Sequence, residues 1–234
     1  MASEQNLLRF GGLAALLVLV VQASAEDEPL RRVIPKPPEL TAGVPQGDRW
    51  KTLLVSTEAA ANWRLEPEWW HFDGEVLVGE AKTAARRNIY GFSLAEYGDF
   101  EAVCQVRLAG HGNPNSALCI RMAPDPQNCL GYQVDMGKDY WGCLYEEKPR
   151  HRTIAPVPRE LEEKLVKKEE WNQFYVHAQG HRIVIWLNGT MTVDLDDQPG
   201  PLRGRLGFQI IHDQVMRAEF RNLYLRPLAD AARP

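Results

Sequence analysis

From residue 50 onward, the chain consists of short runs in which apolar and polar residues alternate, separated by turn-forming residues. In residues 99–108 (DFEAVCQVRL) every second residue is apolar, which is the period of a β-strand with one buried face. Residues 182–195 hold two β-rich runs around Asn188-Gly189, a pair that tolerates the positive φ values of a type I′ turn and predicts a β-hairpin. Further strands are predicted at residues 74–79, 116–122, 131–136, 206–211 and 218–225.

One stretch, residues 158–168 (PRELEEKLVKK), has a helical pattern, because it begins with proline and places Glu and Lys four residues apart. A parallel α/β fold would alternate helices with strands, and that alternation is missing. Roughly ten short strands with one short helix predict an all-β fold, a two-sheet antiparallel sandwich.

The N-terminus has the layout of a secretory signal peptide over residues 1–25. Residues 11–21 (GGLAALLVLVV) are uniformly small or apolar, and Ala23-Ser24-Ala25 follows as a cleavage signature. The run is shorter than the roughly 18 residues of a membrane span, although an uncleaved anchor is the alternative. We therefore expect export to the periplasm or the extracellular space, without stable membrane insertion after cleavage. Residues 26–48 form a Pro-rich lead-in, residues 49–228 the sandwich, and residues 229–234 a tail.

Charge and motif content exclude several classes of function. A formal net charge of −4 argues against a protein that follows nucleic-acid phosphates or an anionic membrane surface. The sequence contains no G-x-S-x-G, H-E-x-x-H, Walker or G-x-G-x-x-G motif, which weakens a serine hydrolase, a zincin, an NTPase and a dinucleotide enzyme. An exported chain permits disulfides among its four cysteines in any of three pairings, and the alternative is that they are small core residues.

Alternation along three strands places four planar polar groups on one sheet surface. If Leu118, Ile120 and Met122 face the core, Arg121 faces the other way. The same argument turns a further set of side chains to that surface: Gln133, Asp135 and Gln209. Amide, carboxylate and guanidinium groups on a concave sheet suit sugar hydroxyls, which need paired donors and acceptors. The alternative is a solvated polar face of an antiparallel sheet.

Residues 140–152 (YWGCLYEEKPRHR) form a second candidate region. Tyr145 could stack on a sugar ring, while Glu146 and His151 could move protons near neutral pH. His212 follows the strand at residues 206–211, where it could join the same site. The alternative is a charged loop in solvent.

Taken in order, several segments resemble the secreted 3-keto-disaccharide hydrolase domain family, also described as 3-ketoglycoside lyases and hydratases. The resemblance covers about residues 62–227 and rests on the ordered set rather than on any one motif. The segments are 70–79 (WHFDGEVLVG), 97–101 (YGDFE), 115–121 (NSALCIR), 131–135 (GYQVD), 141–145 (WGCLY), 170–172 (EWN), 186–189 (WLNG), 207–212 (GFQIIH) and 219–222 (EFRN).

The resemblance implies a concanavalin A-like jelly roll of the lectin and glucanase type, and cleavage of glycosides oxidised to a ketone at C3. A base would remove the C2 proton, the C1 substituent would leave, and water could add back. No nucleotide cofactor is needed, although a divalent metal could hold the enolate. Gln133 departs from the family pattern, which usually carries Glu there. A carbohydrate-binding module without turnover is therefore the alternative to an enzyme.

Roles can be assigned to the candidate residues on this basis. Asp135 or His151 is the expected base, and Arg121 would hold the enolate oxygen. Tyr145 would stack on the sugar or protonate the leaving oxygen. The remaining candidates are Gln133 and Gln209 for hydroxyl binding, and Glu146 and His212 as metal ligands or surface residues.

Overall fold

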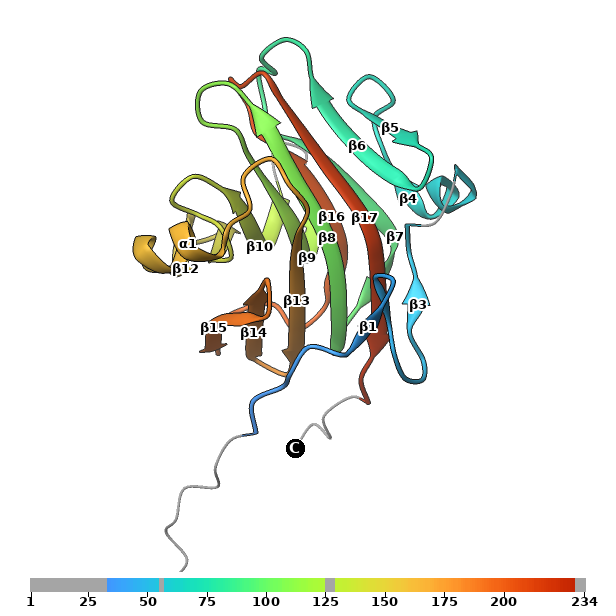
Figure 1. The fold of residues 1–234 in the computed structure, drawn as a ribbon, viewed down its shortest axis with the longest axis vertical. Coiled ribbons are helices and arrows are strands. Elements are labelled where there is room, and N and C mark those ends of the chain that lie inside the picture. The colour runs from blue at the N-terminus through green and yellow to red at the C-terminus, as the bar shows by residue number, and fades with distance from the viewer. Residues whose placement is uncertain (1–32, 55–56, 125–128, 230–234) are drawn as a thin grey trace, which may run out of the picture. The chain divides into compact units, whose positions relative to one another are not determined.

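Two antiparallel β-sheets packed face to face form the fold, as the alternating pattern predicts (Figure 1). The computed structural model describes residues 33–54, 57–124 and 129–229, and the predicted signal peptide lies outside these ranges. Both sheets lie in the unit formed by residues 35–234. Among the described residues, no helix is both long and apolar enough to cross a membrane.

The first sheet has seven strands in the order β12-β11-β10-β9-β16-β7-β4. The strands β7 and β16 lie beside each other although β7 comes early in the chain and β16 late, so this sheet joins distant segments. The bounds are β4 (Trp63–Arg64), β7 (Ile89–Tyr97), β9 (Asn115–Pro124), β10 (Cys129–Gly137), β11 (Leu144–Lys148), β12 (Arg152–Ala155) and β16 (Gly204–Ile210).

The second sheet has eight strands in the order β15-β14-β13-β8-β17-β6-β5, and β3 also pairs with β17. Its bounds are β3 (Lys51–Thr52), β5 (Trp70–Asp73), β6 (Val76–Ala81), β8 (Phe100–Gly110), β13 (Asn172–Gln179), β14 (Arg182–Leu187), β15 (Thr190–Asp196) and β17 (Met216–Pro227). The remaining elements are β1 (Leu40–Thr41), its partner β2 (Val44–Pro45), the 3₁₀ helix η1 (Thr57–Asn62) and α1 (Arg159–Leu165).

The core between the sheets is formed by the residues that alternation assigns to it. In β8 the apolar set at every second position is buried, and Phe208 of β16 meets Phe220 of β17 with ring centroids 4.3 Å apart. The predicted hairpin joins β14 to β15, with φ of 48° at Asn188 and 81° at Gly189. The predicted helix is present as α1, within the expected segment.

The strand β13 is among those absent from the sequence-based prediction. In β13, Tyr175 and His177 face away from the core yet are buried, because both bind the carboxylate of Glu101 in β8. Burial of both faces removes the contrast between apolar and polar positions on which period-two reasoning depends.

The predicted alternation fails at one residue of β9. Arg121 has a φ of 50°, and the pairing of β9 with β16 and β10 shifts register nearby. Such a β-bulge turns the following side chain to the opposite face. Met122 therefore joins a second apolar cluster on the outer side of the seven-stranded sheet instead of the core. The other members of this cluster are Tyr90, Phe92, Ala117, Cys119 and Cys129.

The four cysteines fit the reading as small buried residues. Cys104, Cys119, Cys129 and Cys143 are all buried, and all four are free thiols in this structure. Burial raises the pKa of Cys104, which keeps its thiol protonated and unreactive.

Candidate functional site

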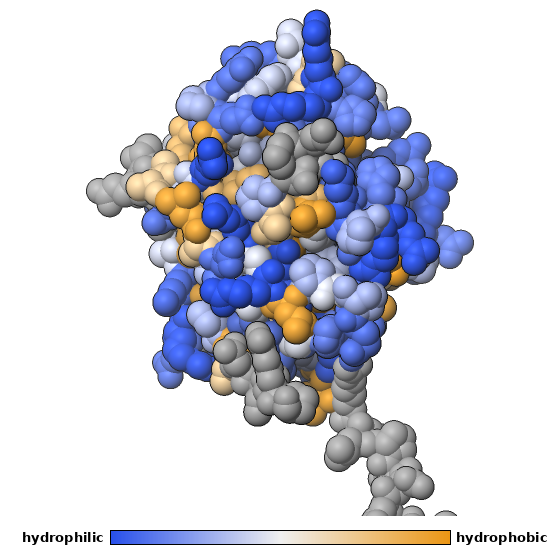
Figure 2. Space-filling view, turned by 180° about the vertical axis from the view of Figure 1, so that it is seen from behind, coloured by the Kyte–Doolittle hydropathy of each residue, from blue (hydrophilic) through white to orange (hydrophobic). Residues whose placement is uncertain are grey.

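A cavity of about 610 Å³ lies on the outer side of the seven-stranded sheet, beside the second apolar cluster. Figure 2 shows the side of the molecule opposite to that of Figure 1, where hydrophobic residues gather in the middle of a hydrophilic surface. Strands β10, β11 and β16 supply the floor of the cavity, and the ends of β9 and β16 supply its rim. The structure brings six of the eight predicted site residues to this cavity: Gln133, Asp135, Tyr145, His151, Gln209 and His212.

Asp135 is the most unusual group in the cavity. It is 4% exposed, and its Oδ1 atom has no hydrogen-bond partner among the described residues. Burial, and then the charge of Glu147, raise the pKa of Asp135 well above its usual value. Two carboxyl groups that share a low-dielectric site cannot both ionise easily, so Asp135 keeps its proton to higher pH. A carboxyl group whose pKa is raised in this way is suited to proton transfer near neutral pH.

Two side-chain amides are held beside Asp135 by one tyrosine. The Tyr90 hydroxyl accepts hydrogen bonds from Nε2 of Gln209 at 2.9 Å and from Nε2 of Gln133 at 3.4 Å. Gln133 Nε2 also donates to Glu147 Oε2 at 2.9 Å. Gln209 is 2% exposed, and its Oε1 atom has no hydrogen-bond partner within the described part of the chain. A buried acceptor without a partner is costly, and a ligand hydroxyl in the cavity would supply one.

Tyr145 and His151 lie together at one side of the cavity. Their rings meet edge to face, with centroids 5.9 Å apart, and His151 Nδ1 is 3.1 Å from the carbonyl oxygen of Glu147. Burial and the charges of Glu147 and Asp135 raise the pKa of Tyr145 to about 12. Tyr145 therefore stays a proton donor, while the side chain of His151 is mostly exposed. His212 lies on the rim, with Nδ1 2.7 Å from Asp213 Oδ2.

Arg121 does not reach the cavity, which corrects the expectation from alternation. The bulge directs its guanidinium to the carbonyl oxygens of Gly98, Gly180 and Pro201 and to Asp99 Oδ1 at 3.1 Å. These bonds tie together loops at one end of the sandwich. The N–H groups of Arg121 are therefore occupied and do not point toward a substrate on the outer face. Burial lowers its pKa, and Asp99 opposes that effect.

Glu146 also lies away from the cavity, because neighbouring residues of β11 point to opposite faces. Glu146 accepts a hydrogen bond from Arg150, whose guanidinium binds both carboxylate oxygens of Asp197. Asp197 in turn accepts a bond from the hydroxyl of Tyr132. These four residues form a paired cluster on the other face of β10 and β11, and all but the partly exposed Arg150 are buried.

Sequence reasoning missed two residues of the site. Glu147 stands two positions after Tyr145, so period-two alternation along β11 would have placed both on the same face. Tyr90 belongs to β7, a strand that was not predicted. No sequence pattern therefore indicated its contact with Gln209.

The described acidic and histidine side chains of the cavity do not form a metal centre. Among the described residues, no group of three or more His, Cys, Asp or Glu side chains is arranged to hold a metal ion. Asp135, Glu147 and His151 line one cavity, but this arrangement does not fit the divalent metal suggested by the chemistry of an enolate.

Several solved structures share this architecture. A proposed glycosyl hydrolase from Parabacteroides distasonis aligns with a TM-score of 0.57 at 20% identity, over 77% of this chain and 100% of that one. The carbohydrate-binding module CBM66 from Bacillus subtilis aligns with a TM-score of 0.52 at 18% identity, over 76% and 95%. The carbohydrate recognition domain of Emp46p aligns with a TM-score of 0.55 at 10% identity, over 76% and 96%. At these identities the likeness establishes the fold, a lectin-like jelly-roll sandwich.

The family is established by sequence. The model of the 3-keto-alpha-glucoside-1,2-lyase-like domain matches residues 49–226, which is most of the chain, and the protein belongs to this family. No curated protein matches the chain.

Proposed function

We propose that this protein cleaves 3-keto-glycosides by removing the proton at C2 and expelling the substituent at C1. The observation that carries the proposal is Asp135, a buried carboxyl group with a raised pKa and an unpaired oxygen in a cavity lined by amides. Membership of the 3-keto-alpha-glucoside-1,2-lyase-like family supports the substrate class. If the predicted signal peptide operates, the reaction takes place outside the cytoplasm.

The chemistry needs a base and a proton donor on one sugar ring. The C3 ketone acidifies the C2 proton, and the electron pair of the C2–H bond moves into an enolate as a base takes the proton. The C1–O bond then breaks, the leaving oxygen takes a proton, and a C1–C2 double bond remains. Addition of water, as hydroxyl to C1 and a proton to C2, completes net hydrolysis. No oxidant or reductant is consumed in these steps.

The cavity supplies groups for each step. Asp135 is our candidate base, because a carboxylate with a raised pKa is better matched to a weakly acidic carbon than an ordinary one. Tyr145, with its pKa raised to about 12, is the candidate donor to the leaving oxygen or to the enolate. Gln133 and Gln209, held by Tyr90, would bind sugar hydroxyls. His151 remains the second candidate for the base, and it lies beside Tyr145.

A carbohydrate-binding module without turnover is the second candidate function. The anchored amides of Gln133 and Gln209 could hold a sugar without any proton transfer, and their fixed geometry favours this reading. The CBM66 structure shows that a sandwich of this kind is used as a binding module. The two functions differ in whether Asp135 exchanges a proton with bound substrate.

Turnover of a 3-keto-glycoside decides between them. Purified protein is incubated with 3-keto-sucrose and with methyl 3-keto-glucosides of both anomers, with and without added divalent metal, and products are followed by NMR. We expect release of the C1 substituent and incorporation of solvent deuterium at C2. Saturable binding of these sugars without release or exchange would establish the binding module instead.

A further inference from the structure

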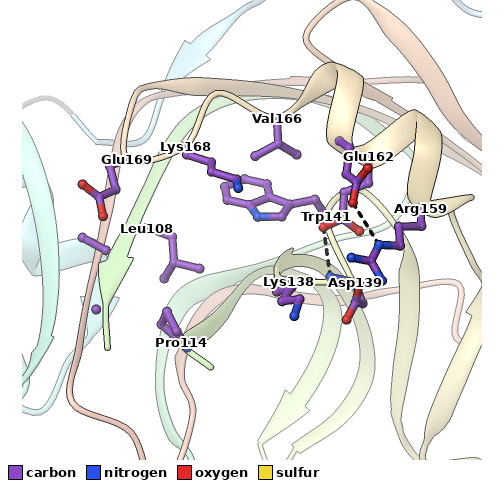
Figure 3. A pocket seen from close by; sticks show the side chains of 13 residues that line it. Leu108, Pro114, Lys138, Asp139, Trp141, Arg159, Glu162, Val166, Lys168 and Glu169 are labelled. Atoms are coloured by element: carbon purple, nitrogen blue, oxygen red, sulfur yellow. Dashed lines mark hydrogen bonds and ion pairs between the residues drawn. The ribbon is translucent and has the colours of Figure 1, made fainter. Parts of the chain in front are cut away.

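A second cavity, of about 330 Å³, lies beside helix α1 (Figure 3). Its walls come from the end of β8, the turn after β10, helix α1 and the segment that follows α1. The described residues that line it do not include Asp135, Gln133 or Gln209, so the proposed reaction makes no use of it. A volume of this size is at the lower end of the range for pockets that bind small molecules.

The floor of this second cavity is an indole held from behind. Trp141 is only 7% exposed, and its ring packs against Phe174 of the core with centroids 6.2 Å apart. Leu108 and Val166 flank Trp141 in Figure 3, so a ligand on this floor meets apolar side chains. The ring of an indole attracts cations as well as apolar groups. Within the described part of the chain, the guanidinium groups that stack on indoles do so on other tryptophans.

One carboxylate of the second cavity lacks a partner. Glu162 of α1 is 7% exposed, and its Oε1 atom accepts a hydrogen bond from the backbone N–H of Asp139 at 2.9 Å. Its Oε2 atom has no hydrogen-bond partner among the residues that the structure describes. Arg159 of the same helix pairs instead with Glu163 at 2.9 Å. A buried carboxylate without a cation is costly, and this one is held in place by its bond to Asp139.

The charges that act on Glu162 favour a cation beside it. Burial raises the pKa of its carboxyl group, and the charges of Asp139 and Glu163 add to this effect. The hydrogen bond from Asp139 and the charge of Arg159 act in the opposite direction. Because burial and like charges both disfavour the ionised carboxylate, a cation that binds beside Oε2 would stabilise it.

The charged groups that line the second cavity leave Glu162 as the excess. Acidic residues outnumber basic ones by four to three. Arg159 and Glu163 pair with each other, and the exposed opening carries two lysines and two acidic residues, namely Lys138, Lys168, Asp139 and Glu169. Water and salt screen charges at such an opening, whereas Glu162 is buried. The lining therefore suits a ligand with one positive charge.

We propose that this second cavity binds a small organic ammonium ion, a primary amine in its charged form that carries an apolar group the size of a single ring. The ammonium group donates a hydrogen bond to Oε2 of Glu162, and the apolar group packs on Trp141. A neutral alcohol would complete the hydrogen bond but leave the buried charge, and an anion would add to that charge. This binding is independent of sugar cleavage, so it neither requires nor tests the proposed function.

Three compounds with the same ring and different charges test the site. Benzylamine, which is an ammonium ion at neutral pH, benzyl alcohol and benzoate are each added to the isotope-labelled protein. The indole N–H resonance of Trp141, assigned with Trp141→Phe, is followed. We expect a saturable shift with benzylamine, a Kd about tenfold higher or more for benzyl alcohol, and no shift with benzoate. Equal affinity for the amine and the alcohol, tighter binding of benzoate, or no shift with any of the three would overturn the proposal.

Glu162→Gln tests the role of the buried charge. The variant keeps the size of the side chain, and its amide oxygen can still accept the bond from Asp139. We expect the Kd for benzylamine to rise about tenfold, equivalent to about 1.4 kcal/mol, as for loss of a hydrogen bond to a charged group. Glu160→Gln removes the same charge from α1 outside the cavity and should leave this Kd unchanged. Equal losses in the two variants would show a long-range effect of charge and overturn the site.

Val166→Phe gives a test that does not depend on charge. The larger side chain occupies part of the second cavity and should abolish the shift with benzylamine. Thermal melting shows whether each variant is folded, and either variant alone decides the matter if the other does not fold. Binding of benzylamine by folded Val166→Phe with the Kd of the wild-type protein would place the ligand elsewhere and overturn the proposal.

Discussion

The two faces of β10 and β11 carry buried polar clusters of opposite character. On one face lies the paired cluster of Tyr132, Glu146, Arg150 and Asp197, in which a guanidinium and a hydroxyl satisfy both carboxylates. On the other face lies the cavity cluster, in which acceptor atoms of two members have no hydrogen-bond partner among the residues that the structure describes. The cavity cluster consists of Tyr90, Gln133, Asp135, Glu147 and Gln209.

From this difference we infer that neighbouring residues of one strand serve stability and function separately. A satisfied buried network holds its strands in place, because removing any member leaves a charged partner unpaired. An unsatisfied cluster costs free energy in the empty protein, and binding a ligand relieves that cost. Proteins accept such a cost mainly at functional sites. We therefore expect the paired cluster to contribute stability and the cavity cluster to bind the ligand.

The largest effect is expected from Asp135→Asn in the cavity cluster. Loss of the base should lower kcat/KM for methyl 3-keto-α-glucoside by about 10²-fold or more. Stability should rise, because the folded-state pKa of Asp135 is raised and ionisation therefore opposes folding at higher pH. The gain in Tm over wild type should grow as the pH rises above the ordinary Asp value.

The exposed Asp73→Asn of β5 is the matched control, and it should change neither quantity. Turnover by Asp135→Asn at the wild-type rate would show that Asp135 is not the base, and His151 would be the remaining candidate. His151→Ala, assayed on the same substrate, would then have to show the loss.

The next effect is expected from Asp197→Asn in the paired cluster. The two bonds from Arg150 and the bond from Tyr132 lower the pKa of Asp197, so its carboxylate stabilises the fold above the ordinary Asp value. We expect the substitution to lower the free energy of unfolding by about 2 kcal/mol, reduced from the value for a fully buried pair because Arg150 is partly exposed.

Urea unfolding at several pH values measures this loss, which should shrink as the pH falls toward the acid range. The sign is opposite to that expected for Asp135→Asn. The kcat/KM of folded Asp197→Asn should stay within twofold of wild type, and a large kinetic loss with unchanged stability would contradict the assignment of this cluster.

Removing one hydroxyl from each cluster sharpens the comparison. Tyr132→Phe deletes the donor to Asp197 and should cost about 1 kcal/mol of stability without changing KM. Tyr90→Phe deletes the acceptor that holds Gln133 and Gln209, and it should raise KM about threefold to tenfold. Chemical denaturation and steady-state kinetics on both variants test the pair, and an exchange of the two outcomes would reverse our assignment.

The smallest effect is expected from Glu147→Gln, which should move a pH profile more than it lowers the maximal rate. Glu147 raises the pKa of Asp135 by its charge, so removing that charge lowers this pKa. Since the ionised form of Asp135 is the base, the acidic limb of kcat/KM should move to lower pH. An unmoved limb would show that Asp135 does not control it.

Much of the fold was predictable because apolar and polar residues alternate along strands such as β8 and β10. Alternation assigned Gln133, Asp135 and Gln209 to one surface, and the structure places all three at the cavity. The fold class and the family follow from the same short strands and ordered motifs. The β13 strand was not predictable, because Glu101 gives its outward polar residues buried partners.

Two features of the site depend on geometry that residue patterns do not encode. A single positive φ at Arg121 reversed the expected face of the residues that follow. Whether Asp135 Oδ1 and Gln209 Oε1 have hydrogen-bond partners depends on every residue packed around them, so only a structure can show that the described residues supply none. The choice between Glu146 and Glu147, in contrast, was open to period-two reasoning from Tyr145.

The hydrogen bond from Gln209 to Tyr90 also has a consequence for the order in which parts of the molecule fold. These residues are 119 positions apart, and their strands β16 and β7 pair only after most of the chain is available. Pairing at such sequence separation carries a large loop-closure cost and forms slowly. Folding intermediates that contain only the local hairpins would therefore lack the arrangement in which Tyr90 holds the amides of Gln133 and Gln209. Acquisition of sugar binding during refolding should thus report completion of the sandwich, later than the appearance of β-structure.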